Sequence, residues 1–297
     1  MASSGDIAVA DRREARERLV GILLIVASAA LFGCVDGLSK LLTEVASVSQ
    51  IVWARYALAM PVLLAMTPAA TRSTLFRTGR PGLLVLRGLT PIGVSIAMVL
   101  AVRYMPLAEA TVILFAAPFL VVALSVPVLG ERVNLSRWIA VAVGFIAVIV
   151  VARPGFDELS HFAIFPMIGA VFYAIMQLVT RRATAAGERP LTILAWTLLA
   201  GTVAATPALF LSWQPLGLKG WLLMLGLGTS FGFAQLMMIA GFARAPAALL
   251  APLAYVQIVS AVIFGMVVFH AVPDAWTLAG IVMIIGSGIY VVRHRGA

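Results

Sequence analysis

The sequence predicts an all-α integral membrane protein with ten transmembrane helices, built as two inverted repeats of five helices each. Three observations predict this architecture. The 297-residue chain is 62% apolar and only 11% charged, with a mean hydropathy of +1.07, whereas a soluble domain needs about 25% charged residues to cover its surface. The apolar residues gather into ten segments, and the sequence repeats itself at a constant offset of 140 residues.

Each apolar segment approaches the roughly 20 residues that a helix needs to cross about 30 Å of hydrocarbon. The segments lie at 19–41, 50–67, 83–102, 107–129, 136–152, 162–179, 191–211, 221–243, 247–269 and 276–292. The connections between them are too short to hold a soluble domain, and they carry Pro, Gly and charged residues. The first segment follows a basic stretch, as a signal peptide does, but its apolar run is too long for one. We therefore expect it to remain in the mature protein.

The repeat is clearest where PLAEATVILFAAPFLVVALSVPVL at 106–129 matches PAALLAPLAYVQIVSAVIFGMVVF at 246–269. One constant offset superimposes the apolar segments as well as the polar connections, which indicates two copies of one unit. Because five segments is an odd number, the second unit enters the membrane upside down. The expected organisation is an N-terminal cytoplasmic tail at 1–18, a first repeat at 19–155 and a second repeat at 156–297.

The distribution of basic residues predicts the orientation. Sixteen of the 21 Lys and Arg residues fall on one side, four fall on the other (Lys40, Arg103, Arg153 and Lys219), and Arg55 lies within a segment. Because cytoplasmic loops carry the excess of Lys and Arg, both termini are predicted to be cytoplasmic, in a bacterial-type inner (plasma) membrane. The net charge of +9 forms no contiguous stripe, so we expect no nucleic-acid partner.

Inverted repeats of this kind are characteristic of secondary transporters, whose substrate site lies near the midplane between the repeats. Several motifs then resemble the ten-helix EamA type of the drug/metabolite transporter superfamily, from about residue 19 to residue 293. They are LFGCVDGLSK at 31–40, LRGLT at 86–90, EATVILFAAP at 109–118 and RWIAVAVGFIAVIVVARPG at 137–155. In the second unit, APLAYVQIVSAVIFG at 251–265 and VPDAWTLAG at 272–280 are most similar to the branch that contains importers of S-adenosylmethionine and riboflavin.

This resemblance implies proton-coupled, exchange or facilitated transport of a small organic solute, with helices three, four, eight and nine lining a central cavity. It favours uptake of a ring-bearing solute such as S-adenosylmethionine or riboflavin, and export of amino acids or drug-like metabolites is the alternative. The expected partners are the small-molecule substrate, the lipid bilayer, and protons or a counter-substrate. No cofactor or metal is expected, and the sequence leaves monomer and dimer open.

The first repeat carries ionisable residues that the second repeat lacks. They lie near the predicted extracytoplasmic ends of segments one to four, and they are Asp36, Lys40, Arg55, Arg103 and Glu109. The residues 140 positions further on are Met176, Thr180, Ala195, Ala243 and Leu249, none of which is ionisable. A charged side chain within a span costs at least about 2.5–3.5 kcal/mol, so it normally faces a cavity or a partner.

Two interpretations of these charges stay open. Asp36 and Lys40 are four residues apart on one helix face and can neutralise each other. Arg55 lies about 5 residues, or about 7 Å, inside its segment. We expect it to pair with Asp36 or Glu109 at an outer gate and to contact an anionic or carboxylate-bearing substrate, and a purely structural ion pair is the alternative. Protonation of Asp36 or Glu109 would couple transport to a proton gradient, which the sequence does not decide.

The candidate substrate-binding residues at membrane depth are aromatic residues and amides. Phe115 and Tyr255 occupy equivalent repeat positions beside Pro118 and Pro252, where a proline frees backbone carbonyls. Gln257 projects from a different side of the same helix than Tyr255. The further candidates are Tyr173, Gln177, Trp196 and Gln235. The rings suit stacking on a ring-bearing substrate, with simple packing as the alternative, whereas buried amides require hydrogen-bond partners.

Other classes of protein are weaker interpretations. A membrane-embedded enzyme requires convergent catalytic groups, but His161, His270 and His294 lie in connections or at segment ends, and the motifs of hydrolases and metalloproteases are missing from the sequence. A non-transporting receptor would bind a solute without flux. The two GlyxxxGly pairs, Gly33/Gly37 and Gly228/Gly232, are predicted to pack helices within the bundle rather than to form a dimer.

Overall fold

The structure is a computed structural model that describes residues 4–129, 135–153, 158–245 and 247–293. Within those ranges every regular element is a helix. Eight stretches are long and apolar enough to cross a membrane. Two shorter apolar helices, Trp138–Ala152 and Ala275–Tyr290, complete a set of ten. These ten helices coincide with the ten apolar segments, so the predicted fold class is confirmed.

The spans of the first repeat are formed by seven helices, two pairs of which share one span each. They are α1 (Ser4–Leu42), α2 with α3 (Val48–Ala57 and Ala59–Met66), α5 (Pro81–Tyr104), α6 with α7 (Leu107–Leu114 and Ala117–Leu129) and α8 (Leu135–Ala152). The spans of the second repeat are α9 (Ile164–Ala185), α10 (Pro190–Leu211), α11 (Leu218–Phe242), α12 with η2 and α13 (Ala247–Leu250, Ala251–Tyr255 and Val256–Phe269) and α14 (Ala275–Arg293). Two short helices, α4 (Ala69–Arg72) and η1 (Glu158–Ala163), lie in connections.

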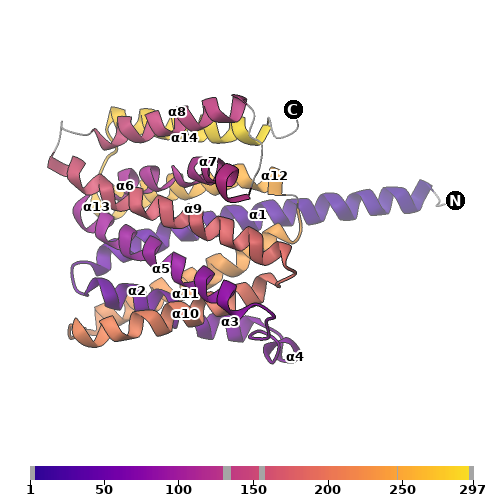
Figure 1. The fold of residues 1–297 in the computed structure, drawn as a ribbon, viewed down its shortest axis with the longest axis horizontal. Coiled ribbons are helices and arrows are strands. Elements are labelled where there is room, and N and C mark those ends of the chain that lie inside the picture. The colour runs from indigo at the N-terminus through magenta and orange to yellow at the C-terminus, as the bar shows by residue number, and fades with distance from the viewer. Residues whose placement is uncertain (1–3, 130–134, 154–157, 246, 294–297) are drawn as a thin grey trace.

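Helix α1 is longer than its apolar segment. Its 39 residues correspond to about 58 Å at the rise of an α-helix, which is almost twice the thickness of the hydrocarbon. Residues 4–18, which the sequence sets apart as a tail, continue the helix, and Figure 1 shows this part projecting beyond the bundle. The C-terminal end of α14 and the short helix α4 lie at the same end of the bundle as this projection (Figure 1).

The helices pack in a pattern that is unchanged when the two repeats are exchanged. Helix α1 packs against α11 as α9 packs against α5, and α10 packs against α5 as α2 and α3 pack against α11. The pairs α2 with α10, α8 with α14 and α6 with α13 each map onto themselves. This pattern is that of two repeats related by a pseudo-two-fold axis, as inverted repeats require.

Three spans are interrupted close to a proline. The break between α2 and α3 lies at Leu58, three residues before Pro61, and the break between α6 and α7 lies at Phe115, three residues before Pro118. The ninth span changes from the 3-10 geometry of η2 to the α-helix α13 at Tyr255, after Pro252. A proline ring clashes with the carbonyl four residues earlier, which explains the breaks that precede Pro61 and Pro118. Phe115 and Tyr255 therefore both lie at helix breaks, in the two spans that pair across the pseudo-two-fold axis.

The GlyxxxGly pairs bring helices together within this chain. A Cβ on Gly33 would lie 2.5 Å from the hydroxyl of Ser260 in α13, and one on Gly228 would lie 2.4 Å from the Cβ of Leu58 at the end of α2. A Cβ on Gly37 would lie within van der Waals overlap of the Phe264 ring, and one on Gly232 would lie 2.9 Å from the Cβ of Val62. The predicted packing of these glycines within the bundle is therefore confirmed.

The exterior of the bundle suits a lipid environment. Many of its exposed side chains are large and apolar, and Val203, Leu222, Val267 and Val282 are each more than half exposed. Charged pairs lie outside the apolar segments, where Glu17 pairs with Arg244 at 3.4 Å and Arg153 pairs with Asp274. A surface of this kind is costly in water and favourable in hydrocarbon.

Candidate functional site

A buried ion pair lies where α1, α2, α5, α11 and α13 approach one another. Arg55 is seven residues into α2, about 10 Å along the helix, and only 5% of it is exposed; Asp36 on α1 is 6% exposed. The Nη2 of Arg55 lies 3.6 Å from Oδ1 of Asp36. Of the two carboxylates that the sequence offers to Arg55, the structure selects Asp36. The described residues therefore show Asp36 paired with Arg55 rather than with Lys40.

Polar groups from three helices, α1, α5 and α13, complete this cluster. Arg55 donates through Nη2 to the hydroxyl of Ser39 at 2.7 Å and through Nη1 to that of Ser95 at 3.4 Å. The Nε2 of Gln257 donates to Oδ2 of Asp36 at 3.0 Å. Because Gln257 belongs to α13, this hydrogen bond joins the charged residues of the first repeat to the second repeat.

Aromatic rings form one wall of the cluster. The guanidinium of Arg55 lies 5.7 Å from the ring centroid of Phe231 on α11, within the range of a cation–π interaction. The Phe231 ring also packs edge-on against Phe32 at 6.1 Å and against Tyr56 at 5.7 Å. The hydroxyl of Tyr56 lies 2.8 Å from that of Ser95. The guanidinium of Arg55 therefore lies beside a cluster of three aromatic rings.

Arg55 retains unused hydrogen-bonding capacity. Its buried Nε has no hydrogen-bond partner among the described residues, and a donor left in that state costs about 1–3 kcal/mol. A carboxylate that accepts from Nε would remove this cost, and the oxygens of Asp36 would accept from an ammonium. The cluster is therefore chemically suited to an α-amino acid head group, which carries both charges.

Phe115 and Tyr255 come together as a second feature. Their ring centroids are 5.4 Å apart and the planes are inclined by 41°. The hydroxyl end of Tyr255 fits against α14, where a Cβ on Gly288 would clash with it. Gln257 instead faces Asp36 on α1, so Tyr255 and Gln257 do project to different sides, as their spacing predicts.

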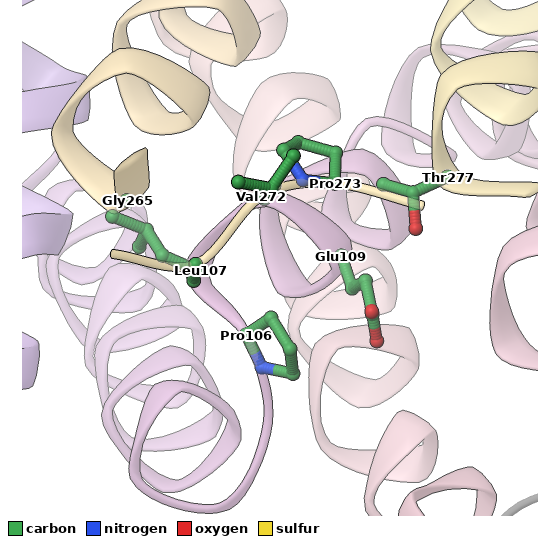
Figure 2. A pocket seen from close by; sticks show the side chains of 9 residues that line it. Pro106, Leu107, Glu109, Gly265, Val272, Pro273 and Thr277 are labelled. Carbon is green, nitrogen blue, oxygen red and sulfur yellow. The ribbon is translucent and has the colours of Figure 1, made fainter. Parts of the chain in front are cut away.

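Lys40 and Glu109 lie closer to the end of the bundle. The Nζ of Lys40 donates to the backbone carbonyl of Met105 at 2.7 Å and lies 5.3 Å from the ring centroid of Phe269. Glu109 lines a small pocket between the start of α6 and the connection from α13 to α14. Figure 2 shows its carboxylate and the hydroxyl of Thr277 among the polar groups of this pocket.

The four remaining candidates occupy different surroundings. Tyr173 packs against the core that contains Phe115 and Tyr255. Trp196 packs beside Leu84, and its Nε1 donates to the backbone carbonyl of Phe76 at 3.3 Å. Gln177 and Gln235 are half-buried, and no hydrogen bond of either amide appears in the described part of the chain. The structure thus groups Tyr173 with the aromatic pair and places Trp196 apart from it.

Sequence reasoning missed Ser39, Tyr56, Ser95 and Phe231, all of which contact or adjoin Arg55. Serine and phenylalanine are common in apolar helices, so only the spacing of Ser39 from Asp36 hinted that one helix face carries both. Arg87 was also missed, because it was grouped with the basic residues of the connections. In the structure it is the seventh residue of α5 and is buried.

The amino-acid sequence is similar to those of known membrane transporters. The model of the EamA-like transporter family matches residues 19–153 and 162–293. An S-adenosylmethionine uptake transporter of Rickettsia bellii is 24% identical and aligns over 86% of this chain and 88% of its own. A pseudopaline exporter of Pseudomonas aeruginosa is 28% identical over 93% of this chain and 96% of its own.

Two further matches extend the comparison. A riboflavin transporter of Brucella anthropi is 27% identical, over 73% of this chain and 78% of its own. A solved structure superposes with a TM-score of 0.64 over 93% of this chain and 99% of its own, at 18% identity. That superposition shows a shared fold.

Proposed function

This chain belongs to the EamA-like transporter family, within the drug/metabolite transporter superfamily, and we propose on that premise that it imports a ring-bearing metabolite. It is a multi-pass membrane transporter rather than an enzyme. The proposed substrate is S-adenosylmethionine or a solute that shares its α-amino acid group and flat ring, with riboflavin as the second candidate. The proposed mechanism is alternating access, in which the two repeats rock about a site between them.

The buried Arg55–Asp36 pair beside Phe231 carries the proposal. A zwitterionic head group would place its carboxylate on the guanidinium of Arg55 and its ammonium on Asp36, while an attached ring stacks on the aromatic wall. The ammonium would compete with Gln257 for Asp36. Because Gln257 lies on the second repeat and Asp36 on the first, substrate binding would loosen one link between the repeats.

The same chemistry ranks the two candidates. S-adenosylmethionine has both an α-amino acid group and a ring, whereas riboflavin has a ring but no charged amino acid group. A relative named as an S-adenosylmethionine uptake transporter spans most of this chain, and so does, over a smaller share, one named as a riboflavin transporter. The ion pair therefore favours S-adenosylmethionine.

We expect proteoliposomes that contain the protein to show saturable uptake of radiolabelled S-adenosylmethionine, exceeding uptake of riboflavin and of phenylalanine. Measurements with and without an imposed pH gradient would separate proton coupling from facilitated transport, and preloading with unlabelled substrate would reveal exchange. Empty liposomes give the background. If riboflavin alone is taken up, the protein is still a transporter, but the role assigned to the α-amino acid group is refuted. If folded protein takes up none of the three solutes, the proposed substrate class is refuted.

Export is the second candidate, because a relative named as a pseudopaline exporter covers 93% of this chain. An α-amino acid group fits the Arg55–Asp36 pair equally well when it arrives from the cytoplasmic side. The two directions differ in a cellular assay: expression of an importer increases the label that intact cells accumulate, whereas expression of an exporter decreases it. Decreased accumulation would show that the direction of transport is export, and the proposed binding site would stay the same.

We further propose that both termini are cytoplasmic and that the site residues near Arg55 open toward the outside. The excess of Lys and Arg on one side supports this orientation. The repeat boundaries at residues 19–155 and 156–297 are proposed from the same alignment of segments. A reporter that is active only outside the cytoplasm should stay inactive when fused to the C-terminus, and activity there would reverse the orientation.

A further inference from the structure

A second buried arginine lies outside the site described above. Arg87 is six residues beyond Pro81, the first residue of α5, and is only 8% exposed. Its Nε donates to the hydroxyl of Thr180 on α9 at 3.1 Å, and its Nη1 donates to that of Thr197 on α10 at 2.7 Å. Three helices therefore hold this guanidinium in a fixed position.

Arg87 has no carboxylate partner among the described residues, since no ion pair joins it to an acid within 4.0 Å. The hydroxyls that hold it are neutral, so its positive charge stays uncompensated within a membrane span. An unpaired buried charge is costly, and charges at membrane depth usually mark a substrate or ion pathway. Arg55 differs from it, because Asp36 neutralises Arg55.

The two arginines lie toward opposite ends of the bundle. Arg55 is the eighth residue of the span that α2 and α3 form and lies beside the last two turns of α1, whereas Arg87 is the seventh residue of α5 and lies beside the end of α9 and the start of α10. Helix α4 marks the Arg87 end in Figure 1.

The pseudo-two-fold axis relates the surroundings of the two arginines. Exchanging the repeats maps the surroundings of Arg55, formed by α1, α2 and α11, onto those of Arg87, formed by α9, α10 and α5. The arginines themselves are not equivalent in sequence, because 140 residues separate Arg55 from Ala195 and Arg87 from Leu227. Among the described residues, each of these two surroundings holds one buried arginine, which α2 supplies in one and α5 in the other.

We propose that Arg87, Thr180 and Thr197 form a second anion site, which receives the carboxylate of the transported molecule when the site opens toward the end where α4 lies. Identifying the anion as the substrate's carboxylate rests on the proposed function; the anion site itself does not. The two arginines would then act in turn, one from each side of the membrane. Thr180 and Thr197 are positioning residues that hold the guanidinium.

The anion site can be tested without knowing the substrate. The full-length protein in detergent is heated in increasing sodium acetate at constant ionic strength, because a ligand that binds only the folded state raises the melting temperature. We expect acetate to stabilise the wild type, and to stabilise the Arg55→Lys variant less but still measurably, because Arg55 can itself receive a carboxylate and Arg87 remains in that variant. Affinity should fall about tenfold or more in Arg87→Gln, because a charge-assisted hydrogen bond is lost. Arg80→Gln, an exposed arginine at the same end of α5, should behave as the wild type.

Several outcomes would overturn the site. They are the absence of stabilisation in the wild type, equal stabilisation in Arg87→Gln, and equal loss in Arg80→Gln. If Arg87→Gln does not fold, Arg87→Lys takes its place: it keeps the charge but cannot reach both hydroxyls with one planar group. Acetate affinity weakened at least about fivefold in Arg87→Lys supports the site, and unchanged affinity overturns it.

A second assay tests the link to transport. In proteoliposomes of known orientation, labelled S-adenosylmethionine is applied to one side at a time. We expect Arg87→Lys to raise KM mainly from the side where α4 lies, whereas a structural defect would act equally from both sides. If S-adenosylmethionine is not transported while acetate stabilisation depends on Arg87, the proposed substrate fails and the anion site stands. Transport with equal effects from both sides would refute the assignment of the substrate carboxylate to Arg87.

Discussion

Replacing Arg55 with alanine is expected to abolish transport and also to destabilise the folded protein. The substitution leaves the carboxylate of Asp36, which is 6% exposed, without its cationic partner. Removing one partner of a buried ion pair costs about 3–5 kcal/mol. Two measurements check this expectation: the melting temperature of the purified protein, and the initial rate of substrate uptake at equal amounts of folded protein in the liposomes.

The matched control is Arg103→Ala. Arg103 is an exposed arginine near the end of α5, and its guanidinium lies over the ring of Tyr104. A surface charge of this kind contributes about 0–1 kcal/mol, so this variant should keep wild-type stability and transport. Normal transport by folded Arg55→Ala protein would remove Arg55 from the site.

A double variant distinguishes substrate binding from a structural ion pair. Asp36→Asn with Arg55→Gln removes both charges at once, and it should recover much of the stability that the single change loses, because no buried charge is then left alone. If Arg55 binds the substrate, transport stays abolished in the double variant although the protein is folded. Recovery of transport together with stability would show that the pair serves only the fold.

Much of the fold could be predicted because its cause is visible in the sequence. Apolar segments long enough to cross the bilayer have few alternative structures, since backbone polar groups must be satisfied within lipid. The repeat then predicted more than the number of helices. Phe115 and Tyr255 are equivalent positions beside prolines, and the structure places their rings 5.4 Å apart at two helix breaks.

The charged site could be predicted only in part. An unusual residue such as Arg55 stands out in an apolar segment, and the need for a counter-charge limits its partners to nearby carboxylates. The choice of Asp36 over Glu109 depends on how α1, α2 and α6 are rotated, which no pattern in the sequence specifies. The serines and Phe231 around Arg55 are equally unpredictable, because the same residue types occur throughout the bundle without a special role.

The buried position of Arg87 could not be predicted, for a different reason. Counting basic residues for topology treats every arginine near a segment end as part of a connection. A constant offset between repeats also cannot relate Arg87 to Arg55, because the two come from helices that are not equivalent. Only the exchange of packing partners between α2 and α10 and between α11 and α5 relates their surroundings.

The contact between α2 and α11 holds Arg55 in place, and Gly228 controls how closely these helices approach. A Cβ on Gly228 would lie 2.4 Å from the Cβ of Leu58 and 2.8 Å from the backbone carbonyl of Ala54. A backbone atom cannot turn aside as the end of a side chain can, so α2 would have to move as a unit. Arg55 lies between Ala54 and Leu58 and would move with it.

We therefore expect Gly228→Ala to destabilise the protein by about 1–3 kcal/mol, the usual cost of overpacking, and to slow uptake severely. Gly226→Ala is the matched control two residues away on the same helix, where the nearest atom, Cδ1 of Leu38, would be 3.8 Å from the new Cβ. Alanine favours a helix over glycine by up to about 1 kcal/mol, so this control should be as stable as the wild type or more so. Thermal unfolding and uptake of the two variants, compared side by side, test the expectation. Equal stability and equal uptake would mean that α2 and α11 are not in close contact, and that Arg55 does not depend on Gly228 for its position.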